Sequence, residues 1–146
     1  MDTADKRFEE TGLILPTAAT PIGLYKTLLI DGKHLLVSGH GPLQNDGTNI
    51  IGRIGDTMDI EEGKLAAQQV GLSILSTIKK NLGSLDKVKR VIKVLGMLNC
   101  VAEFDKHPYV INGCSELFKK VWGEDNGIGM RFRQIPSAKE YFHPDP

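Results

Sequence analysis

The clearest pattern of apolar residues lies near the middle of the chain and predicts a helix over residues 60–82. Apolar side chains recur there at steps of three and four residues, which places them on one helix face. Asp59 is a suitable N-cap, Glu62 completes a capping box, and Gly83 is the expected residue after the last turn. A second stripe of the same period predicts a helix over residues 108–122.

Several shorter apolar stretches predict strands. Residues 25–30 and 34–38 flank an Asp-Gly pair that signals a hairpin, and a short strand is expected at 50–54. Residues 88–101 are largely apolar in one alternating register and partly so in the other, which predicts a long central strand at least partly covered on both faces. This order of elements predicts an α+β domain in which two helices pack on one face of a mixed sheet.

The chain length allows one core. A sequence of 146 residues suits a single domain, which we place at residues 13–135. The polar residues 1–12 are expected to be flexible or loosely docked. Residues 136–146 form an atypical tail, because three of these eleven residues are prolines, which cannot donate to a sheet ladder.

Charge and the reactive residue types narrow the function classes. The 18 basic and 18 acidic side chains cancel, which counts against the broad positive surface of a non-specific nucleic-acid binder. Cys100 and Cys114 form no pair with metal or disulfide spacing and are interpreted as reduced, apolar residues. The four histidines show no ligand spacing, so nothing in the sequence supports a metal site. The polar start is unlike a signal peptide, and a cytoplasmic location is expected.

Three places combine residues that could form a site. A turn-rich segment presents Tyr25 at the start of a strand, and the segment 38–42 places Ser38 beside two glycines that leave the backbone open. Asn112 lies early in the second helix, where Asn is a poor interior residue. On spacing alone, a sharp sheet corner and a polar helix start explain the last two better than a site does.

Taken in order, these segments resemble the Rid family, also called the YjgF or L-PSP endoribonuclease family. One branch of that family reads S-G-x-G-P, then G-x-[VI]-G, then G-[DS]-L-D-x-V-x-R-V, then V-I-N-G. The resemblance runs from about residue 15 to residue 131. The matching segments here are S-G-H-G-P at 38–42, G-R-I-G at 52–55, G-S-L-D-K-V-K-R-V at 83–91 and V-I-N-G at 110–113.

The resemblance implies a chorismate-mutase-like α+β barrel and a homotrimer with ligand clefts between subunits. It implies hydrolysis of reactive enamines and imines of amino acids to 2-keto acids and ammonia, without metal or cofactor. Two other functions stay open. One is a non-catalytic trimer that binds small carboxylates or a partner protein. The other is an endoribonuclease, which has family precedent only and which the zero net charge disfavours.

Carried over residue by residue, the resemblance assigns catalytic roles to Tyr25, Ser38 and Asn112. It assigns Arg131 to the clamp on the substrate carboxylate, because a guanidinium can bind a carboxylate through two parallel hydrogen bonds. Gly39 and Gly41 would supply the open backbone of the binding site.

The resemblance breaks after Arg131. Phe132 and Arg133 occupy positions that are normally small in the family, and no apolar alternation follows that could form a closing strand. Glu140 follows Arg131 too closely to match the glutamate that positions water in the family. The sequence therefore predicts a missing closing strand and weakened turnover.

Overall fold

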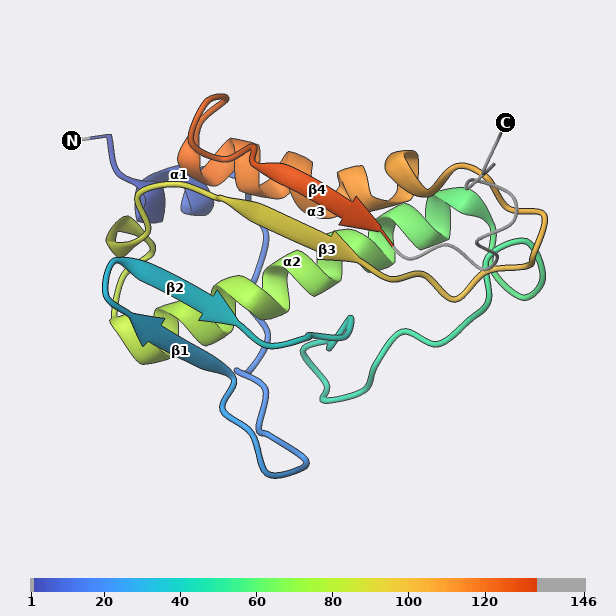
Figure 1. Ribbon diagram of the computed structural model, residues 1–146, viewed down its shortest axis with the longest axis horizontal. Helices are drawn as coiled ribbons and strands as arrows, with labels where there is room; N and C mark the ends of the chain where they lie inside the picture. Colours follow the sequence, from blue (N-terminus) through green and yellow to red (C-terminus); the bar gives the residue numbers. More distant parts are fainter. Residues whose placement is uncertain (1, 134–146) are drawn as a thin grey trace, which may run out of the picture.

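The elements of the structure alternate between helices and short strands (Figure 1). The computed structural model describes residues 2–133. Both predicted helices are confirmed to within one residue. In chain order the elements are α1 (Ala4–Glu10), β1 (Leu28–Asp31), β2 (His34–Val37), α2 (Ile60–Leu82), a 3-10 turn (Leu85–Lys87), β3 (Lys93–Gly96), α3 (His107–Trp122) and β4 (Met130–Arg133).

Local chemistry sets both ends of α2. The Asp59 carboxylate accepts a hydrogen bond from the Glu62 amide at 2.8 Å, which satisfies one of the free N–H groups of the first turn. At the other end Gly83 adopts φ +85°, and its amide donates to the Lys79 carbonyl. The predicted cap and stop signals are therefore confirmed.

The two long helices lie side by side and run in the same direction (Figure 1). Near their starts, Tyr109 of α3 donates a hydrogen bond to the Glu61 carboxylate of α2. The backbones approach so closely that a Cβ added at Gly113 would lie 2.0 Å from the Lys64 carbonyl oxygen. The glycine of the V-I-N-G segment therefore allows the α2–α3 contact.

Most of the core lies between these helices and the elements around them. Cys114 is buried in it, as its place in the apolar stripe predicts, and both cysteines are free thiols. The main cluster consists of Ala4, Phe8, Leu72, Leu75, Ile78, Leu85, Cys114, Leu117, Phe118, Val121 and Trp122.

The strands form two separate pairs on one side of the helix layer (Figure 1). β1 and β2 form an antiparallel hairpin in which Asp31 lies opposite His34, so the loop begins one residue later than the Asp-Gly signal suggests. β3 and β4 are parallel and joined through α3, as a parallel pair requires a crossover connection. The domain is α+β with the helices on one face, as predicted.

The predicted long strand over residues 88–101 is wrong in its length. The 3-10 turn ends at Lys87, residues 88–92 are neither helix nor strand, and only Lys93–Gly96 pairs as a strand. The expected strand at 50–54 is reduced to isolated bridges from Ile54 to Met58 and Cys100. Hydrophobic alternation marks where a strand is possible, whereas the neighbouring chain decides where hydrogen bonds form.

The outer face of the strands is apolar and largely exposed, so the central strand, predicted to be at least partly covered on both faces, is covered mainly on one face in the single chain. Val94 packs toward the helix layer, whereas Leu95 is 56% exposed. Exposed large apolar residues on the four strands and directly after β3 are Leu29, Ile30, Leu36, Leu95, Met97, Met130 and Phe132. An apolar surface of this kind marks an interaction site more often than free surface.

The N-terminal residues differ from the expected flexible end. Ala4–Glu10 form α1, and its Ala4 and Phe8 side chains are buried in the main core. Arg7 Nε donates to the Val121 carbonyl at 2.8 Å, and the Asp5 carboxylate accepts from the Leu85 amide at 2.9 Å. Two apolar residues four apart gave too little pattern to reveal this short helix, whose stability comes from docking.

Among the described residues, no helix has both the length and the apolar character needed to cross a membrane.

Candidate functional site

Arg131 reaches its place through two close backbone approaches before β4. A Cβ at Gly127 would lie 2.4 Å from the Phe118 carbonyl oxygen, and one at Gly129 would lie 2.6 Å from the carbonyl oxygen of Ile92. Only glycine permits both contacts, which bring the segment against α3 and β3. β4 then pairs Arg131 with Val94, and both residues face the helix layer.

The Arg131 guanidinium is held by the first three turns of α3. Nη1 donates to the Asn112 side-chain oxygen at 2.8 Å and to the Pro108 carbonyl at 3.1 Å. Nη2 donates to the Ser115 hydroxyl at 2.6 Å. The structure thus joins two of the residues that the resemblance assigns, Asn112 and Arg131, in one hydrogen-bonded cluster.

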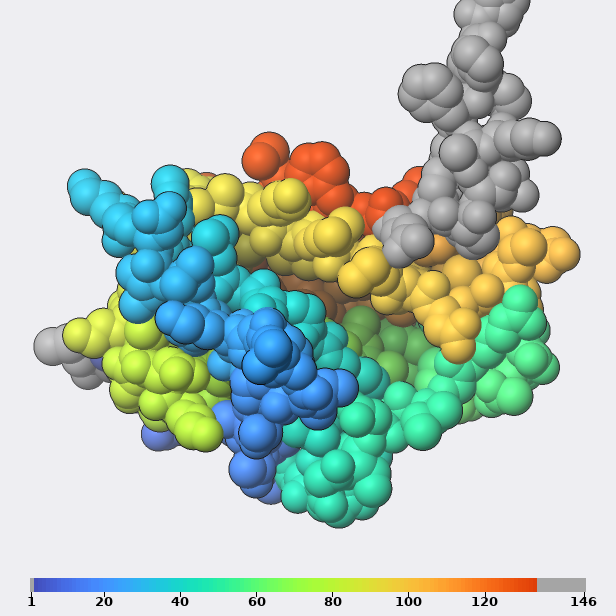
Figure 2. All heavy atoms as spheres, turned by 60° about the horizontal axis from the view of Figure 1, so that its bottom comes forward, coloured from blue at the N-terminus to red at the C-terminus, as the bar shows by residue number. Residues whose placement is uncertain are grey.

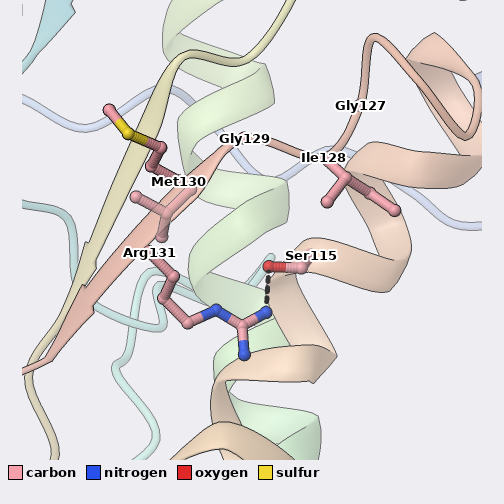
Figure 3. Close-up of a pocket in the computed structure, with 7 residues that line it drawn as sticks. Ser115, Gly127, Ile128, Gly129, Met130 and Arg131 are labelled. Atoms are coloured by element: carbon pink, nitrogen blue, oxygen red, sulfur yellow. Dashed lines mark hydrogen bonds between the residues drawn. The ribbon is translucent and has the colours of Figure 1, made fainter.

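A small hollow lies beside this cluster, between the start of β4 and α3 (Figure 3). Its volume is about 210 Å³. Arg131 is the only charged residue in its lining among the described residues. The lining consists of Val94, Ser115, Gly127, Ile128, Gly129, Met130 and Arg131.

Partial burial shapes the electrostatics of the cluster. Desolvation lowers the pKa of the Arg131 guanidinium from its usual high value, yet an arginine stays charged at neutral pH. Nearby, burial raises the pKa of the Cys114 thiol to about 12. Cys114 is therefore protonated and unsuited to act as a nucleophile. The charge that this cluster can offer a ligand is that of the Arg131 guanidinium.

Tyr25 and Ser38 lie apart from this cluster. The segment before β1 includes a loop that projects from the body of the molecule (Figure 1). Tyr25 lies in the sequence three residues before β1 and is 47% exposed. Its hydroxyl accepts a hydrogen bond from the Ile22 amide, and the Ser38 hydroxyl donates to the Lys26 carbonyl at 2.5 Å. Within the described part of the chain, neither side chain hydrogen-bonds to Arg131 or Asn112.

The glycine corner after β2 is held by a histidine. His40 Nδ1 lies 2.7 Å from the Ser38 carbonyl oxygen, which can only accept, so Nδ1 donates there, and Nε2 lies 2.8 Å from the buried Thr77 hydroxyl. No atom of residues 2–133 outside the neighbours of Gly39 lies within 4 Å of where its Cβ would stand, whereas a Cβ on Gly41 would lie 3.2 Å from the Asn49 side-chain oxygen. Viewed from the strand side, the surface is recessed between the segment after β2 and the β3 segment (Figure 2).

Ser115 and the Pro108 carbonyl are site groups that the sequence-based prediction missed. Ser115 lies three residues after Asn112, so the two side chains share one face of α3. That spacing is the one signal that could have pointed to it. The contact with Arg131 depends on how β4 packs, which no helical period shows.

No group of three or more His, Cys, Asp and Glu side chains suited to a metal ion occurs among the described residues. Cys100 and His107 approach one another, with Sγ and Nε2 3.6 Å apart, but they are only two donors.

Comparison with known proteins places this fold and its residues in a family. Residues 5–136 match the family described as "YjgF/chorismate_mutase-like, putative endoribonuclease". The chain belongs to this YjgF family. The match begins within α1, so the docked N-terminal helix is part of the family domain.

Individual relatives agree with the YjgF assignment. Protein TCP17 of Trypanosoma cruzi is 36% identical over 123 residues, covering 84% of this chain and 77% of TCP17. The crystal structure of "a putative endoribonuclease" from Shewanella oneidensis MR-1 superposes with a TM-score of 0.85 at 28% identity, over 90% of this chain and 87% of that one. The structure of Atu1372 of Agrobacterium tumefaciens, a protein of unknown function, superposes with a TM-score of 0.76 at 33% identity. The match covers 92% of this chain and 80% of Atu1372.

The predicted departures from the family pattern are only partly within the described residues. Phe132 is 49% exposed on the outer face of β4, where the Lys93 ammonium lies 4.8 Å from its ring centre. The bulky residue is thus accommodated outside the core. Glu140 and the atypical tail at 136–146 lie outside the described residues. The prediction that the closing strand is missing also concerns those residues.

Proposed function

We propose that this YjgF-family chain binds small 2-imino or 2-keto acids and hydrolyses reactive enamine and imine intermediates of amino acids. An enamine first tautomerises to the imine by moving a proton from nitrogen to its β-carbon; water then adds to the imine carbon, and the resulting carbinolamine loses ammonia to leave a 2-keto acid. The reaction needs a fixed carboxylate, a directed water and a proton for the leaving nitrogen.

The observation that carries the proposal is the arrangement of Arg131. Its guanidinium is anchored by Asn112, Ser115 and the Pro108 carbonyl, while part of it borders the hollow. An anchored arginine pays little further ordering cost when it binds a planar carboxylate. Asn112 still has its side-chain NH₂ group, which has no hydrogen-bond partner among the described residues.

Tyr25 and Ser38 enter this proposal from a neighbouring subunit of a homotrimer. The apolar outer face of the strands supports an assembly, since it would be buried between subunits. Ile22 and Leu24, which flank the glycine before Tyr25, are 97% and 108% exposed, and they would be covered in the same way. The proposed location is the cytoplasm, with no nucleic-acid or membrane partner.

Ammonia release tests the catalytic proposal. Iminopyruvate or 2-aminoacrylate would be generated enzymatically, and ammonia formation followed with and without the protein. We expect a rate above the buffer blank, and a rate equal to the blank would contradict catalysis.

Calorimetry tests the binding half of the proposal separately. We expect wild-type protein to bind 2-ketobutyrate and Arg131→Ala to bind about a hundredfold more weakly, because the positive charge and its hydrogen bonding to the carboxylate are lost. Arg53→Ala is the matched control, since that exposed arginine lies outside the cluster and forms a surface ion pair with Asp56. Equal binding by Arg131→Ala and wild type would contradict the assignment.

A non-catalytic trimer that binds small carboxylates is the second candidate. It is favoured by the sequence after Arg131, which offers no residue that matches the water-positioning glutamate of the family. It predicts that 2-ketobutyrate binds while ammonia release stays at the blank.

Light scattering tests the assembly. The proposal expects a mass near three times 16.0 kDa. A charge in the outer face, as in Leu95→Asp, should shift the mass toward one chain without unfolding it, because the side chain is exposed in the single subunit.

A further inference from the structure

The hydrogen bonds that Arg131 makes within the chain show which of its N–H groups remain available to a ligand. A guanidinium has five N–H groups, and both on Nη1 are used by Asn112 and the Pro108 carbonyl. One of the two on Nη2 is used by Ser115. The Nε–H group and one N–H of Nη2 therefore have no partner among the described residues.

Figure 3 shows how the guanidinium is oriented. Nε and the nitrogen bonded to Ser115 lie on the side of the group nearer the Ile128–Gly129 wall, and the third nitrogen turns away from it. Both Ser115 and Arg131 line the hollow. The free Nε–H group and the Ser115 side chain thus border the same space.

The Ser115 hydroxyl can serve a ligand as well as Arg131. A hydroxyl has one hydrogen to donate and two lone pairs to accept with. Its oxygen accepts from Nη2, and its hydrogen has no acceptor among the described residues. The bond from a cationic donor also polarises the hydroxyl, which strengthens its own donation.

We propose that Ser115 is a substrate-binding residue, which holds the ligand carboxylate together with the Nε–H group of Arg131. One carboxylate oxygen accepts from Nε–H and the other from the Ser115 hydroxyl. This proposal rests on the proposed function, which names the carboxylate but assigns Ser115 no contact with it.

The rest of the hollow indicates the side chain of that ligand. Val94, Ile128 and Met130 supply apolar walls, and no second charged group lines the hollow among the described residues. A second carboxylate on the ligand would have no partner there, and an unpaired charge is costly to desolvate. The ligand is therefore a short aliphatic 2-imino or 2-keto acid with one carboxylate.

The test is calorimetric titration of the full-length protein with 2-ketobutyrate and with 2-ketoglutarate. Ser115→Ala should bind 2-ketobutyrate about tenfold more weakly, because one hydrogen bond to a charged group is lost. Ser115→Thr, which retains the hydroxyl, should bind close to wild type. Ser73→Ala is the matched control, since Ser73 is a buried helical serine whose hydroxyl has no hydrogen-bond partner in the described part of the chain. Wild type should bind 2-ketoglutarate about tenfold more weakly than 2-ketobutyrate.

The Arg131→Lys background separates direct binding from positioning. Lysine keeps the charge, so residual binding can be measured, and removal of the Ser115 hydroxyl should still weaken it several-fold. If the cost disappears in that background, Ser115 only positions Arg131 and the proposal is wrong. If Ser115→Ala binds as wild type does, the proposal is wrong while the proposed function stands. Equal binding of the two acids overturns the assignment of the hollow, and no binding by wild type overturns the proposed function itself.

Discussion

The starts of α2 and α3 lie side by side but are built in opposite ways. α2 begins with the Asp59 cap and carries two acidic residues in its first turn. α3 follows Lys106 and has no acidic residue in its first turn. Within residues 2–133, no side chain caps its start, and the Nδ1 atom of the buried His107 has no hydrogen-bond partner. The first start satisfies its own backbone, whereas the second uses its backbone and side chains to hold Arg131. Departures from local rules are expected where a site is built.

The largest effect on stability is expected where the first turns of α2 and α3 contact each other. Gly113→Ala should destabilise the protein by about 3 kcal/mol or more, because the added Cβ would overlap the Lys64 backbone and force the helices apart. Gly71→Ala is the control at the same helix pair, where the nearest atoms are the Leu117 and Cys114 side chains at 3.0 and 3.3 Å. Urea unfolding of both variants compares the costs. A cost for Gly113→Ala no larger than for Gly71→Ala would mean that the α2–α3 contact can relax.

The buried histidine at the start of α3 should make that start sensitive to acid. Burial lowers the pKa of His107, with Arg133 contributing in the same direction. The neutral form is thus favoured in the folded chain, and protonation favours unfolding. Stability is full above about pH 6.5, the ordinary value, and falls as the pH drops toward the folded pKa, by at most about 1.4 kcal/mol per unit.

Urea unfolding at pH 8 and pH 5.5 measures this dependence. His107→Gln should remove part of the loss at low pH. His34→Gln, at an exposed histidine in β2, should leave it unchanged. If wild type and His107→Gln lose the same unfolding free energy between pH 8 and pH 5.5, the protonation of His107 does not contribute to the acid sensitivity.

The α2 cap should account for a smaller part of the stability. Asp59→Ala removes the acceptor of the Glu62 amide and is expected to cost about 1 kcal/mol in urea unfolding. Asp59→Asn retains an acceptor and should cost less. If Asp59→Ala is as stable as wild type, the side-chain cap that distinguishes the start of α2 from that of α3 contributes nothing to the free energy of unfolding.

The smallest effect is expected at the uncapped start. Lys106 places a positive charge at the positive end of the α3 dipole, so Lys106→Gln should stabilise the protein by roughly 0.3 kcal/mol at low ionic strength. The gain should disappear at high salt. Lys33→Gln, in the β1–β2 hairpin loop, should change nothing. A loss of stability in Lys106→Gln would show that this lysine makes a contact that α3 needs.

How far the fold could be predicted from sequence depended on how local each signal was. The ends of α2 were predicted because Asp59 and Gly83 act within one turn of the chain. The strand over 88–101 was overestimated because an apolar run shows what can be buried and not which partner strand is present. α1 was missed because its stability comes from contacts with α3 and the 3-10 turn, far away in sequence.

The candidate site divides in the same way. The resemblance assigned Arg131 and Asn112 separately, and the structure shows that they hydrogen-bond to one another. Ser115 could not be singled out, because a serine three residues after an asparagine is unremarkable until Arg131 packs against both. Tyr25 and Ser38 keep their predicted roles as proposals, since their place relative to Arg131 depends on the assembly.

By itself the sequence determined the two long helices, the hairpin and the α+β class, since caps, turns and hydrophobic period act over a few residues. Only the tertiary structure decided that β4 pairs in parallel with β3 and turns Arg131 toward Asn112 and Ser115, which lie 19 and 16 residues away along the chain. The physical reason is that these hydrogen bonds depend on how an intervening helix packs across two strands. No local pattern encodes that packing.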